Sequence, residues 1–310
     1  MQKKTNRKTN MQMIRKCMPL YIMMLPCIVY LIINNYIPMA GIVVAFKKYN
    51  VKTGLFGGQW IGLSNFEYLF KQDAFLIIRN TFLYNIAFII INLILGVAVA
   101  IMISDITGKF SRKIYQSAIL FPFVVSWVIV SYIVYAFLSV ENGMINNSIL
   151  DFFGSPPVEW YSETKYWPFI LVLVNAWKSL GYGCLLYIAA IAGIDKEMYE
   201  SAQLDGASKW KQIWYITIPN MIPTMITVVL LQIGRIFYSD FGLFYQVPQN
   251  SGALYPVTNT IDTYVYRAMM SAGGIGRSAA ACVFQSFMGF IFIMLANFIV
   301  RKVDRDSALF

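Results

Sequence analysis

The chain has 310 residues, of which 58% are hydrophobic and only 13% are charged. This composition is too apolar for an ordinary soluble domain and predicts a chain that lies mostly in lipid. The 25 Lys and Arg outnumber the 15 Asp and Glu, and there is no histidine, which excludes His-based acid–base chemistry and the commonest metal ligand.

Six long runs contain no charged residue or only one, and each exceeds the roughly 20 residues that a membrane-spanning helix needs. They predict an all-α polytopic membrane protein with six transmembrane helices, at about 18–45, 80–103, 114–139, 166–192, 218–239 and 278–300. Residues 1–16 form a basic tail and 17–310 the transmembrane domain. A further uncharged run, 241–261, is interrupted by Pro248, Gly252 and Pro256, and we interpret it as an external loop.

The positive charges fall mainly on one side of the predicted membrane. Fifteen of the 25 Lys and Arg lie in 1–16, 105–113, 195–211 and 301–310, and seven lie in the alternate loops 47–75, 141–165 and 240–277. The positive-inside rule therefore predicts that both termini and the loop around residue 200 are cytoplasmic. Because topology accounts for the net charge of +10, nucleic acid is not expected as a partner.

Prolines and an aromatic segment characterise the first span and the loop after it. Pro26 and Pro38 lie within the span and predict a kink, or a bend near its outer side. The loop contains the aromatic, amphipathic segment 60–70, which predicts a helix on the outer membrane surface. Within it, Gly62-Leu63-Ser64-Asn65-Phe66 resembles a segment common in sugar-importer permeases of the maltose type.

Amide side chains occur in the second span, and a proline occurs in the third. Asn80, Asn85 and Asn92 belong to the second span, where amides more often join helices than bind substrate. Pro122 lies within the third span, which we expect to be one helix over 114–139.

The fourth span carries a charge near its middle. Lys178 would cost at least about 2.5–3.5 kcal/mol there unless it is paired or hydrated. Asn175 and Tyr182 lie three residues before it and four after it, so the three side chains share one helical face. Two interpretations remain open: Lys178 forms a buried pair with an acid elsewhere, or it lines a cavity and donates to substrate hydroxyls.

A polar stretch, 195–217, separates the fourth and fifth spans. Good helix formers precede Gly206, which is a natural helix stop. The stretch therefore predicts a short helix, a turn, and a second helix whose Trp210 and Trp214 lie at the membrane interface.

This stretch also carries a family pattern. Glu200-Ser201-Ala202-Gln203-Leu204-Asp205-Gly206-Ala207, followed by Ile216-Thr217-Ile218-Pro219, resembles the EAA loop of permease subunits of bacterial ATP-binding-cassette importers. The family has Ala where Ser201 stands and Leu where Ile218 stands. The resemblance implies that Glu200, Ser201, Ala202, Asp205, Gly206 and Ala207 form a coupling element that docks into a separate ATPase subunit. The alternative is an ordinary amphipathic cytoplasmic loop.

The fifth span ends in a polar and aromatic region. Gln232, Arg235 and Ser239 are spaced to share a helical face, and Arg235 would lie about 24 Å above Pro219, in the outer third of the bilayer. Aromatic side chains follow, which suit either a sugar or an interfacial belt. The candidate substrate-pathway residues are Asn175, Lys178, Tyr182, Gln232, Arg235, Tyr238 and Asp240.

The external stretch 255–267 resembles a segment typical of permeases for oligosaccharides or polysaccharide fragments that work with a surface lipoprotein. Together the three resemblances imply a type I importer permease fold in the bacterial plasma membrane. They also imply a homologous second permease in a heterodimer, two ATPase subunits that hold ATP and Mg, an extracellular solute-binding lipoprotein, and a carbohydrate substrate. The chain itself is expected to bind no cofactor.

Motifs for chemistry are missing from the sequence. It has no phosphate-binding Gly-rich loop, no nucleophile elbow and no acidic metal cluster, so we expect no catalytic residue and no metal ligand. Two alternatives to a sugar importer remain: an importer permease for a non-sugar solute, and a self-sufficient secondary transporter. The second would predict an internal repeat with paired broken helices, and the sequence gives no sign of one.

Overall fold

The computed structural model describes residues 3–50, 52–54, 56–70, 72–271, 274–303 and 308. The regular secondary structure of these residues is helical, apart from two isolated β-bridges, Lys47 with Trp60 and Asn50 with Gly54. The predicted all-α membrane fold is confirmed. The helices are α1 (Lys3–Leu31), α2 (Ile37–Met39), α3 (Gln72–Ser104), α4 (Lys109–Val124), α5 (Trp127–Leu138), α6 (Trp167–Ala192), α7 (Lys196–Leu204), α8 (Lys209–Gln212), α9 (Ile218–Ile233), α10 (Tyr255–Thr258), α11 (Ile261–Met270) and α12 (Ile275–Val303).

Short π-helical and 3₁₀ turns connect or extend these helices, at Ile32–Tyr36, Ala40–Phe46, Ser64–Phe70, Ile145–Leu150, Ile213–Thr217, Gly242–Gln246 and Gly252–Leu254. Within the described residues, five helical stretches are long and apolar enough to cross a membrane: Cys17–Phe46, Ala74–Ser104, Trp167–Ala192, Lys209–Ile233 and Ile275–Lys302. A sixth is present if α4 and α5 count as one bent span.

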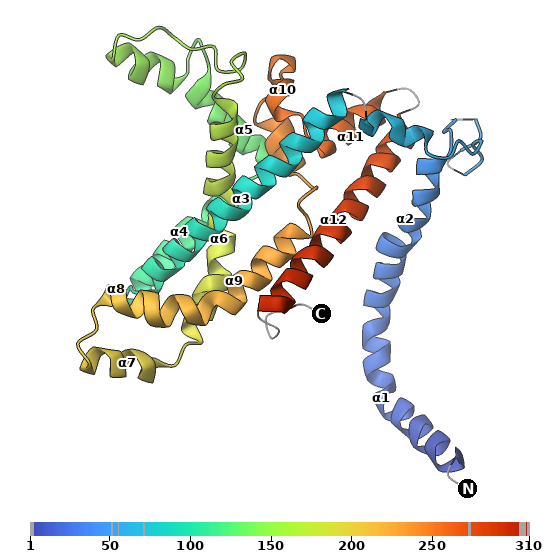
Figure 1. Cartoon of the computed structure of the whole chain (residues 1–310), viewed down its shortest axis with the longest axis horizontal. Helices are drawn as coiled ribbons and strands as arrows, with labels where there is room; N and C mark the ends of the chain where they lie inside the picture. Colours follow the sequence, from blue (N-terminus) through green and yellow to red (C-terminus); the bar gives the residue numbers. More distant parts are fainter. Residues whose placement is uncertain are drawn as a thin grey trace.

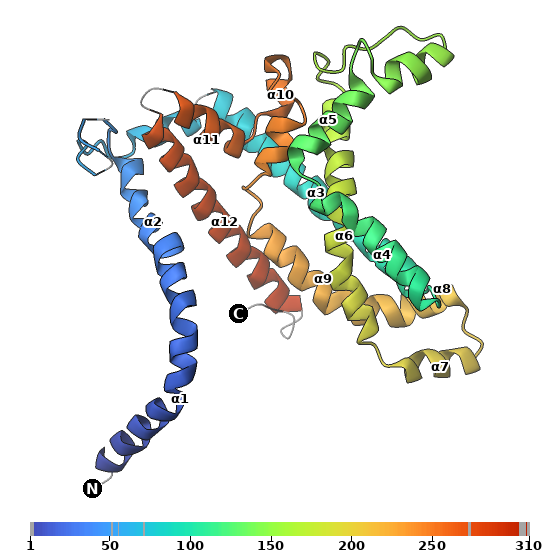
Figure 2. The same cartoon turned by 180° about the vertical axis from the view of Figure 1, so that it is seen from behind.

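The helices form two packed groups. In Figures 1 and 2, α3, α4 and α6 lie together, and α9 runs beside α12. Helices α10 and α11 gather at one end of the molecule and α7 lies at the other. We call these the α11 end and the α7 end; the positive-inside rule predicts that the α7 end is cytoplasmic.

The first span stands apart from the rest of the chain. None of its most hydrophobic stretch is buried, and Figure 1 shows α1 separated from the helix groups along most of its length. The type of helix changes around Pro38, because a π-helical turn at Ile32–Tyr36 precedes it and a 3₁₀ segment follows it, while Cys17–Phe46 remains one helical stretch. Most of the basic tail is helical, since α1 begins at Lys3; Met1 and Gln2 lie outside the described residues.

Asn65 of the external segment fastens the end of the first span to the beginning of the last. Its side-chain nitrogen donates to the carbonyls of Ala45 and Lys47, both at 2.9 Å. Gly276, in the first turn of α12, allows this approach: a Cβ there would lie 2.7 Å from the same nitrogen.

The amides of α3 join segments that are distant in sequence, as predicted. Asn80 donates to the carbonyls of Pro256 and Asn259 at 3.0 and 3.2 Å. Asn85 donates to the carbonyl of Tyr238 at 3.0 Å. Asn92 donates to the side-chain oxygen of Asn175 on α6 at 3.1 Å.

The third span is not the single helix expected over 114–139. Helices α4 and α5 meet at 95° across Val125 and Ser126. Pro122 lacks the N–H that would continue the hydrogen bonding of α4. Ser126 then begins α5, and its hydroxyl accepts a bond from the N–H of Ile129 at 3.4 Å.

The fifth span is shorter than the expected helix over 218–239. Helix α9 ends at Ile233, and the backbone is irregular from Gly234 to Asp240. The α-helical spacing on which the expected common face of Gln232, Arg235 and Ser239 rests therefore does not continue as far as Ser239. Spans three and five are thus both broken, a feature that the sequence alone did not reveal.

Side chains from other helices replace the lost helical hydrogen bonds at this second break. Gln285 of α12 donates to the carbonyl of Phe237 at 2.9 Å. Asp262 of α11 accepts from the backbone N–H and the hydroxyl of Ser239 at 2.6 and 2.9 Å. Buried backbone groups need partners, and these polar residues supply them.

Close contact between α4 and α6 depends on Gly181, which provides a matched test. A Cβ at Gly181 would lie 2.1 Å from the carbonyl oxygen of Ile119, a backbone atom that cannot rotate away, whereas nothing lies within 4 Å of a Cβ at Gly183. We expect Gly181→Ala to destabilise the protein by about 1–3 kcal/mol through overpacking. Gly183→Ala should be neutral or slightly stabilising, because Ala favours helix. Apparent melting temperatures of the purified transporter would test this; equal values would contradict the packing argument.

Candidate functional site

Two regions hold the residues singled out from the sequence. The first, which we call the coupling loop, is Asp195–Thr217 at the α7 end. The second, which we call the break region, comprises the break in the third span at Val125 and Ser126, the break in the fifth span from Gly234 to Asp240, and the middle of α6.

Helix α7 has defined caps at both ends. Asp195 caps its beginning, with a carboxylate oxygen that accepts from the N–H of Glu197 at 3.0 Å. At its end Gly206 has a φ of +74°, in the left-handed region that glycine adopts without a steric penalty. The N–H of Ala207 bonds to the carbonyl of Ala202 at 2.8 Å and that of Gly206 bonds to Gln203 at 3.0 Å. This pair of bonds is the Schellman motif.

Most of the surface of α7 is exposed within the described chain. None of its residues is buried, and Leu204 is 90% exposed. Glu200, Ser201, Asp205 and Gly206 are exposed, while Ala202 and Ala207 are half-buried. Figure 1 shows α7 lying apart across the end of the molecule.

The return from α7 into the membrane is a continuous helical segment. Helix α8, the π-helical turn Ile213–Thr217 and α9 follow one another without a loop from Lys209 to Ile233. The second helix of the coupling loop is therefore not a separate interfacial helix but the beginning of the fifth span. Trp210, Trp214 and Tyr215 are exposed along this beginning.

Two hydrogen bonds hold the coupling loop together, and one ion pair joins it to the turn after α3. The amide of Gln212, which is buried, donates to the carbonyl of Ala207 at 3.1 Å. The Tyr199 hydroxyl bonds to that of Thr217 at 2.9 Å. Lys209 forms an exposed ion pair with Asp105 in the turn after α3, an interaction worth about 0–1 kcal/mol.

Lys178 supplies hydrogen bonds to the backbone at the first break. Its side chain is 7% exposed, and its ammonium group donates to the carbonyls of Pro122 at 3.2 Å, Phe123 at 3.1 Å and Val125. Carbonyls at the end of a helix have no partner within it and carry the negative end of the helix dipole. An ammonium has three donors, so Lys178 uses all of them on the end of α4. Its partners are these carbonyls, and no acid lies within ion-pair distance of it in the described chain.

Trp127 links the two breaks. The Lys178 ammonium lies 4.9 Å from the centre of its ring, within the range of a cation–π contact. Its indole N–H donates to a carboxylate oxygen of Asp240 at 2.9 Å. The other Asp240 oxygen accepts from the N–H of Gly242 at 2.9 Å. A Cβ on Gly242 would lie 2.1 Å from the Trp127 ring, so glycine is required there.

The remaining predicted pathway residues lie around this link in different environments. Asn175 is buried and bonded to Asn92, whereas Tyr182 is 56% exposed and stacks on Phe123 with ring centres 4.9 Å apart. The Tyr238 hydroxyl bonds to Ser286 at 2.8 Å. Gln232 is half-buried and Arg235 exposed, and no hydrogen bond or ion pair joins either side chain to another described residue. The structure thus brings Lys178 and Asp240 together through Trp127.

The part of the chain that contains the coupling loop and the break region is similar to known proteins. A family model described as "Binding-protein-dependent transport system inner membrane component" matches residues 92–306, which is more than half of the chain. The chain belongs to this family. It is a multi-pass inner membrane permease and a non-catalytic subunit, and the secondary-transporter alternative is excluded.

Individual relatives resemble the permease over nearly its whole length. It is 31% identical over 289 residues to the polygalacturonan/rhamnogalacturonan transport system permease protein YteP of Bacillus subtilis (strain 168), covering 93% of this chain and 89% of that one. A bacterial ABC transporter involved in the import of the acidic polysaccharide alginate has a similar chain, with a TM-score of 0.85 and 29% identity over 96% of this chain and 99% of that chain. A bacterial alginate ABC transporter solved with an alginate pentasaccharide-bound periplasmic protein gives a TM-score of 0.83 and 29% identity, covering 94% of the permease and 97% of its chain.

Three residues at the breaks of the permease were missed in the sequence. Trp127 looked like any aromatic residue of a span, and Asp262 belongs to the segment 255–267, for which no individual role was evident. Gln285 is buried in α12 and donates to both Phe237 and Asp262. A polar residue inside an apolar span is costly and therefore informative, so the reasoning that selected Lys178 would also have selected Gln285.

The two interpretations of Lys178 predict different losses, which a substitution separates. We expect Lys178→Met to remove three hydrogen bonds from the carbonyls at the end of α4, at a cost of about 3 kcal/mol or more, since hydrogen bonds to charged groups contribute roughly 1.5–3 kcal/mol each. The amount of permease that co-purifies with its partner subunits should fall. Tyr182→Ala, one turn away and exposed, should assemble normally. Normal assembly of Lys178→Met with a loss of uptake alone would show that the ammonium serves the substrate instead.

Proposed function

We propose that this permease forms, with a homologous second permease, the translocation pathway for an oligosaccharide or polysaccharide fragment that an extracellular solute-binding lipoprotein delivers. Two ATPase subunits, which hold ATP and Mg, supply the energy. Both termini and the coupling loop lie in the cytoplasm. The observation that carries the proposal is the break region. There, side-chain hydrogen bonds satisfy the backbone of two interrupted membrane spans.

Broken helices at membrane depth support a pathway there. Irregular backbone is tolerated in lipid only where it is buried in protein or lines a water-filled cavity. Arg235 follows α9 within such irregular backbone and is exposed. A charge facing lipid would cost at least about 2.5–3.5 kcal/mol, so we place Arg235 on the aqueous side, facing the second permease.

Aromatic rings next to this region suit a sugar. Phe241, Tyr245 and Tyr266 form a cluster with ring centres 4.7 to 5.1 Å apart, directly after Asp240. The exposed ring of Tyr182 lies at the other break. Rings with nearby polar groups match a ligand that has apolar faces and many hydroxyls. No observation favours the non-sugar alternative.

The charges at the second break favour an acidic sugar. The two carboxylates nearest Arg235 in the sequence already accept hydrogen bonds from other groups. Asp240 accepts from Trp127 and Gly242, and Asp262 accepts from Ser239 and Gln285. Arg235 is therefore a free cation in the described pathway, and a guanidinium pairs well with a carboxylate. The relatives named for polygalacturonan and for the acidic polysaccharide alginate agree with a uronate-containing substrate.

The exposed α7 is the proposed contact with the ATPase. Glu200, Ser201, Ala202, Asp205, Gly206 and Ala207 would form its docking surface. The Schellman turn at Gly206 sets the angle between α7 and the continuous segment from Lys209 to Ile233, which ends at the second break. A movement of α7 would therefore pass through the turn at Gly206 and along one continuous helical segment to the backbone that carries Arg235.

Gly206 tests the coupling role with a matched pair. No atom lies within 4 Å of a Cβ placed there, so a substitution is limited by backbone conformation alone. Asn tolerates the left-handed region, whereas a β-branched residue does not. We expect Gly206→Asn to keep ATP-driven uptake near the wild-type level. Gly206→Val should reduce uptake several-fold, with ATP hydrolysis uncoupled or the ATPase lost on co-purification. Full, coupled transport by Gly206→Val would show that the loop is not the coupling element.

Substitutions of Arg235 test the proposed class of substrate and the proposed negative charge of the substrate. The assay is uptake by the reconstituted transporter of an oligogalacturonate and of its methyl ester, which lacks the carboxylate charge. We expect Arg235→Gln to reduce uptake of the acid about tenfold or more, because it removes a charge-assisted hydrogen bond whose free energy corresponds to about that factor. Uptake of the ester should change much less. Arg235→Lys should retain most of the uptake, and Lys302→Gln serves as a control for loss of a distant cation.

The outcomes separate the two parts of the proposal. An equal loss for acid and ester would reject the acidic preference and leave the sugar pathway in place. If the wild-type transporter with its binding protein takes up no oligosaccharide, whether acidic or neutral, the carbohydrate assignment itself is rejected.

A further inference from the structure

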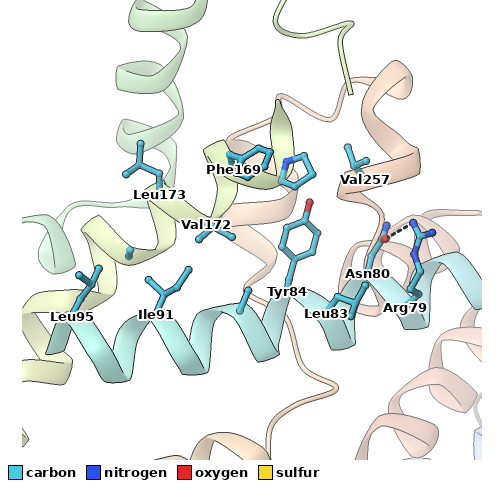
Figure 3. A pocket seen from close by; sticks show the side chains of 13 residues that line it. Arg79, Asn80, Leu83, Tyr84, Ile91, Leu95, Phe169, Val172, Leu173 and Val257 are labelled. Atoms are coloured by element: carbon cyan, nitrogen blue, oxygen red, sulfur yellow. Dashed lines mark hydrogen bonds between the residues drawn. The ribbon is translucent and has the colours of Figure 1, made fainter. Parts of the chain in front are cut away.

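A groove separate from the coupling loop and the break region lies between α3 and α6, next to α10. Figure 3 shows it, with a cavity volume of about 690 Å³. Its lining is largely apolar and comes from Arg79, Asn80, Leu83, Tyr84, Ala87, Ile91, Leu95, Pro168, Phe169, Val172, Leu173, Ala176 and Val257.

Polar groups occur at only one end of the groove lining. Arg79, Asn80 and Tyr84 lie toward the beginning of α3, at the α11 end, where the beginning of α6 and α10 also contribute. The opposite end is lined by Leu95 and Leu173 and has no polar side chain. The distance from Arg79 to Leu95 along α3 is about 24 Å. The groove therefore changes from polar to apolar along α3, away from the α11 end.

Tyr84 has an unsatisfied hydroxyl in the polar part. Its ring packs edge-on against Phe244 with centres 4.9 Å apart, and the side chain is 7% exposed. No described group makes a hydrogen bond with the hydroxyl. In Figure 3 it points away from α3, toward the wall that contains Phe169 and Val257. A buried hydroxyl is rarely left without a partner, so a ligand acceptor is expected there.

Arg79 supplies a cation beside this hydroxyl. It is exposed, and its guanidinium donates to the side-chain oxygen of the adjacent Asn80 at 3.1 Å. No carboxylate lies within ion-pair distance of it among the described residues. An arginine in the first turns of a membrane span reaches the level of the lipid phosphates, and guanidinium and phosphate form strong, directed hydrogen bonds.

We propose that the groove binds a phospholipid from the leaflet at the α11 end. Its phosphate lies on Arg79, an ester carbonyl accepts from the Tyr84 hydroxyl, and one acyl chain follows Leu83, Ile91 and Leu95. The change from polar to apolar side chains along the groove matches a lipid whose headgroup lies at the α11 end.

The test uses the assembled transporter in vesicles of phosphatidylethanolamine and phosphatidylglycerol, with a fraction of the phosphatidylglycerol carrying a photoreactive diazirine on one acyl chain. After irradiation, mass spectrometry measures labelling of residues 83–95 and 169–176. We expect both segments to be labelled in the wild type. Arg79→Gln should lower the labelling about fivefold through loss of the phosphate contact, and Arg79→Lys should restore most of it.

Two further variants and a control make the result specific. Ala87→Phe places a ring midway along the groove and should reduce labelling about tenfold, because the chain no longer fits. Tyr84→Phe removes only a hydroxyl that has no protein partner, so it should fold normally and lower labelling about twofold. Lys48→Gln removes an exposed cation from the other side of the α11 end and should change nothing.

Three outcomes would overturn the proposal. One is absence of labelling in the wild type, and another is equal labelling in the wild type, Arg79→Gln and Ala87→Phe. The third is labelling of the isolated chain but not of the assembled transporter, which would mean that a helix of the second permease covers the groove. None of these readouts depends on which solute is transported.

Discussion

The structure depends on the hydrogen bonds that the Lys178 ammonium donates to the end of α4. A helix that stops inside a membrane exposes carbonyls that lipid cannot satisfy, and here one buried ammonium satisfies three of them. The 95° turn into α5 is possible because these bonds compensate for the helix end. The same turn positions Trp127 between Lys178 and Asp240, so the first break determines where the second can lie.

The second break and the coupling loop are the two ends of one helical segment. At the α7 end, Gly206 and the Schellman bonds determine how α7 joins Lys209–Ile233. At the other end, Gln285 and Asp262 hold the unwound backbone that carries Arg235 and Tyr238. A transport subunit without chemistry of its own has to convert a partner's movement into a change at the pathway, and a continuous helix is a stiff way to do so. The proposed docking of α7 and the proposed role of Arg235 are therefore linked physically.

Polar side chains inside the membrane have three distinct uses in this permease. The amides of α3 join helices, and Lys178, Asp262 and Gln285 satisfy broken backbone. Arg235 and the Tyr84 hydroxyl are left without described partners, and we assign them to ligands of different kinds, a solute carboxylate and a lipid ester. The difference follows from surroundings: Arg235 lies in irregular backbone near the breaks, whereas Tyr84 lies in an apolar groove between α3 and α6.

The sequence alone was sufficient for features that depend on local composition. These are the all-helical membrane fold, the helix that stops at Gly206, and the joining role of Asn80, Asn85 and Asn92, because apolar run length, glycine and intramembrane amides act locally. The breaks in spans three and five, the partners of Lys178 and the role of Trp127 required the tertiary structure. Lys178 bonds to carbonyls more than 50 residues away, and Trp127 bonds to Asp240 across 113 residues. A helix in lipid can end only where a distant side chain replaces its hydrogen bonds, so where it ends is decided by the packing of other helices against it.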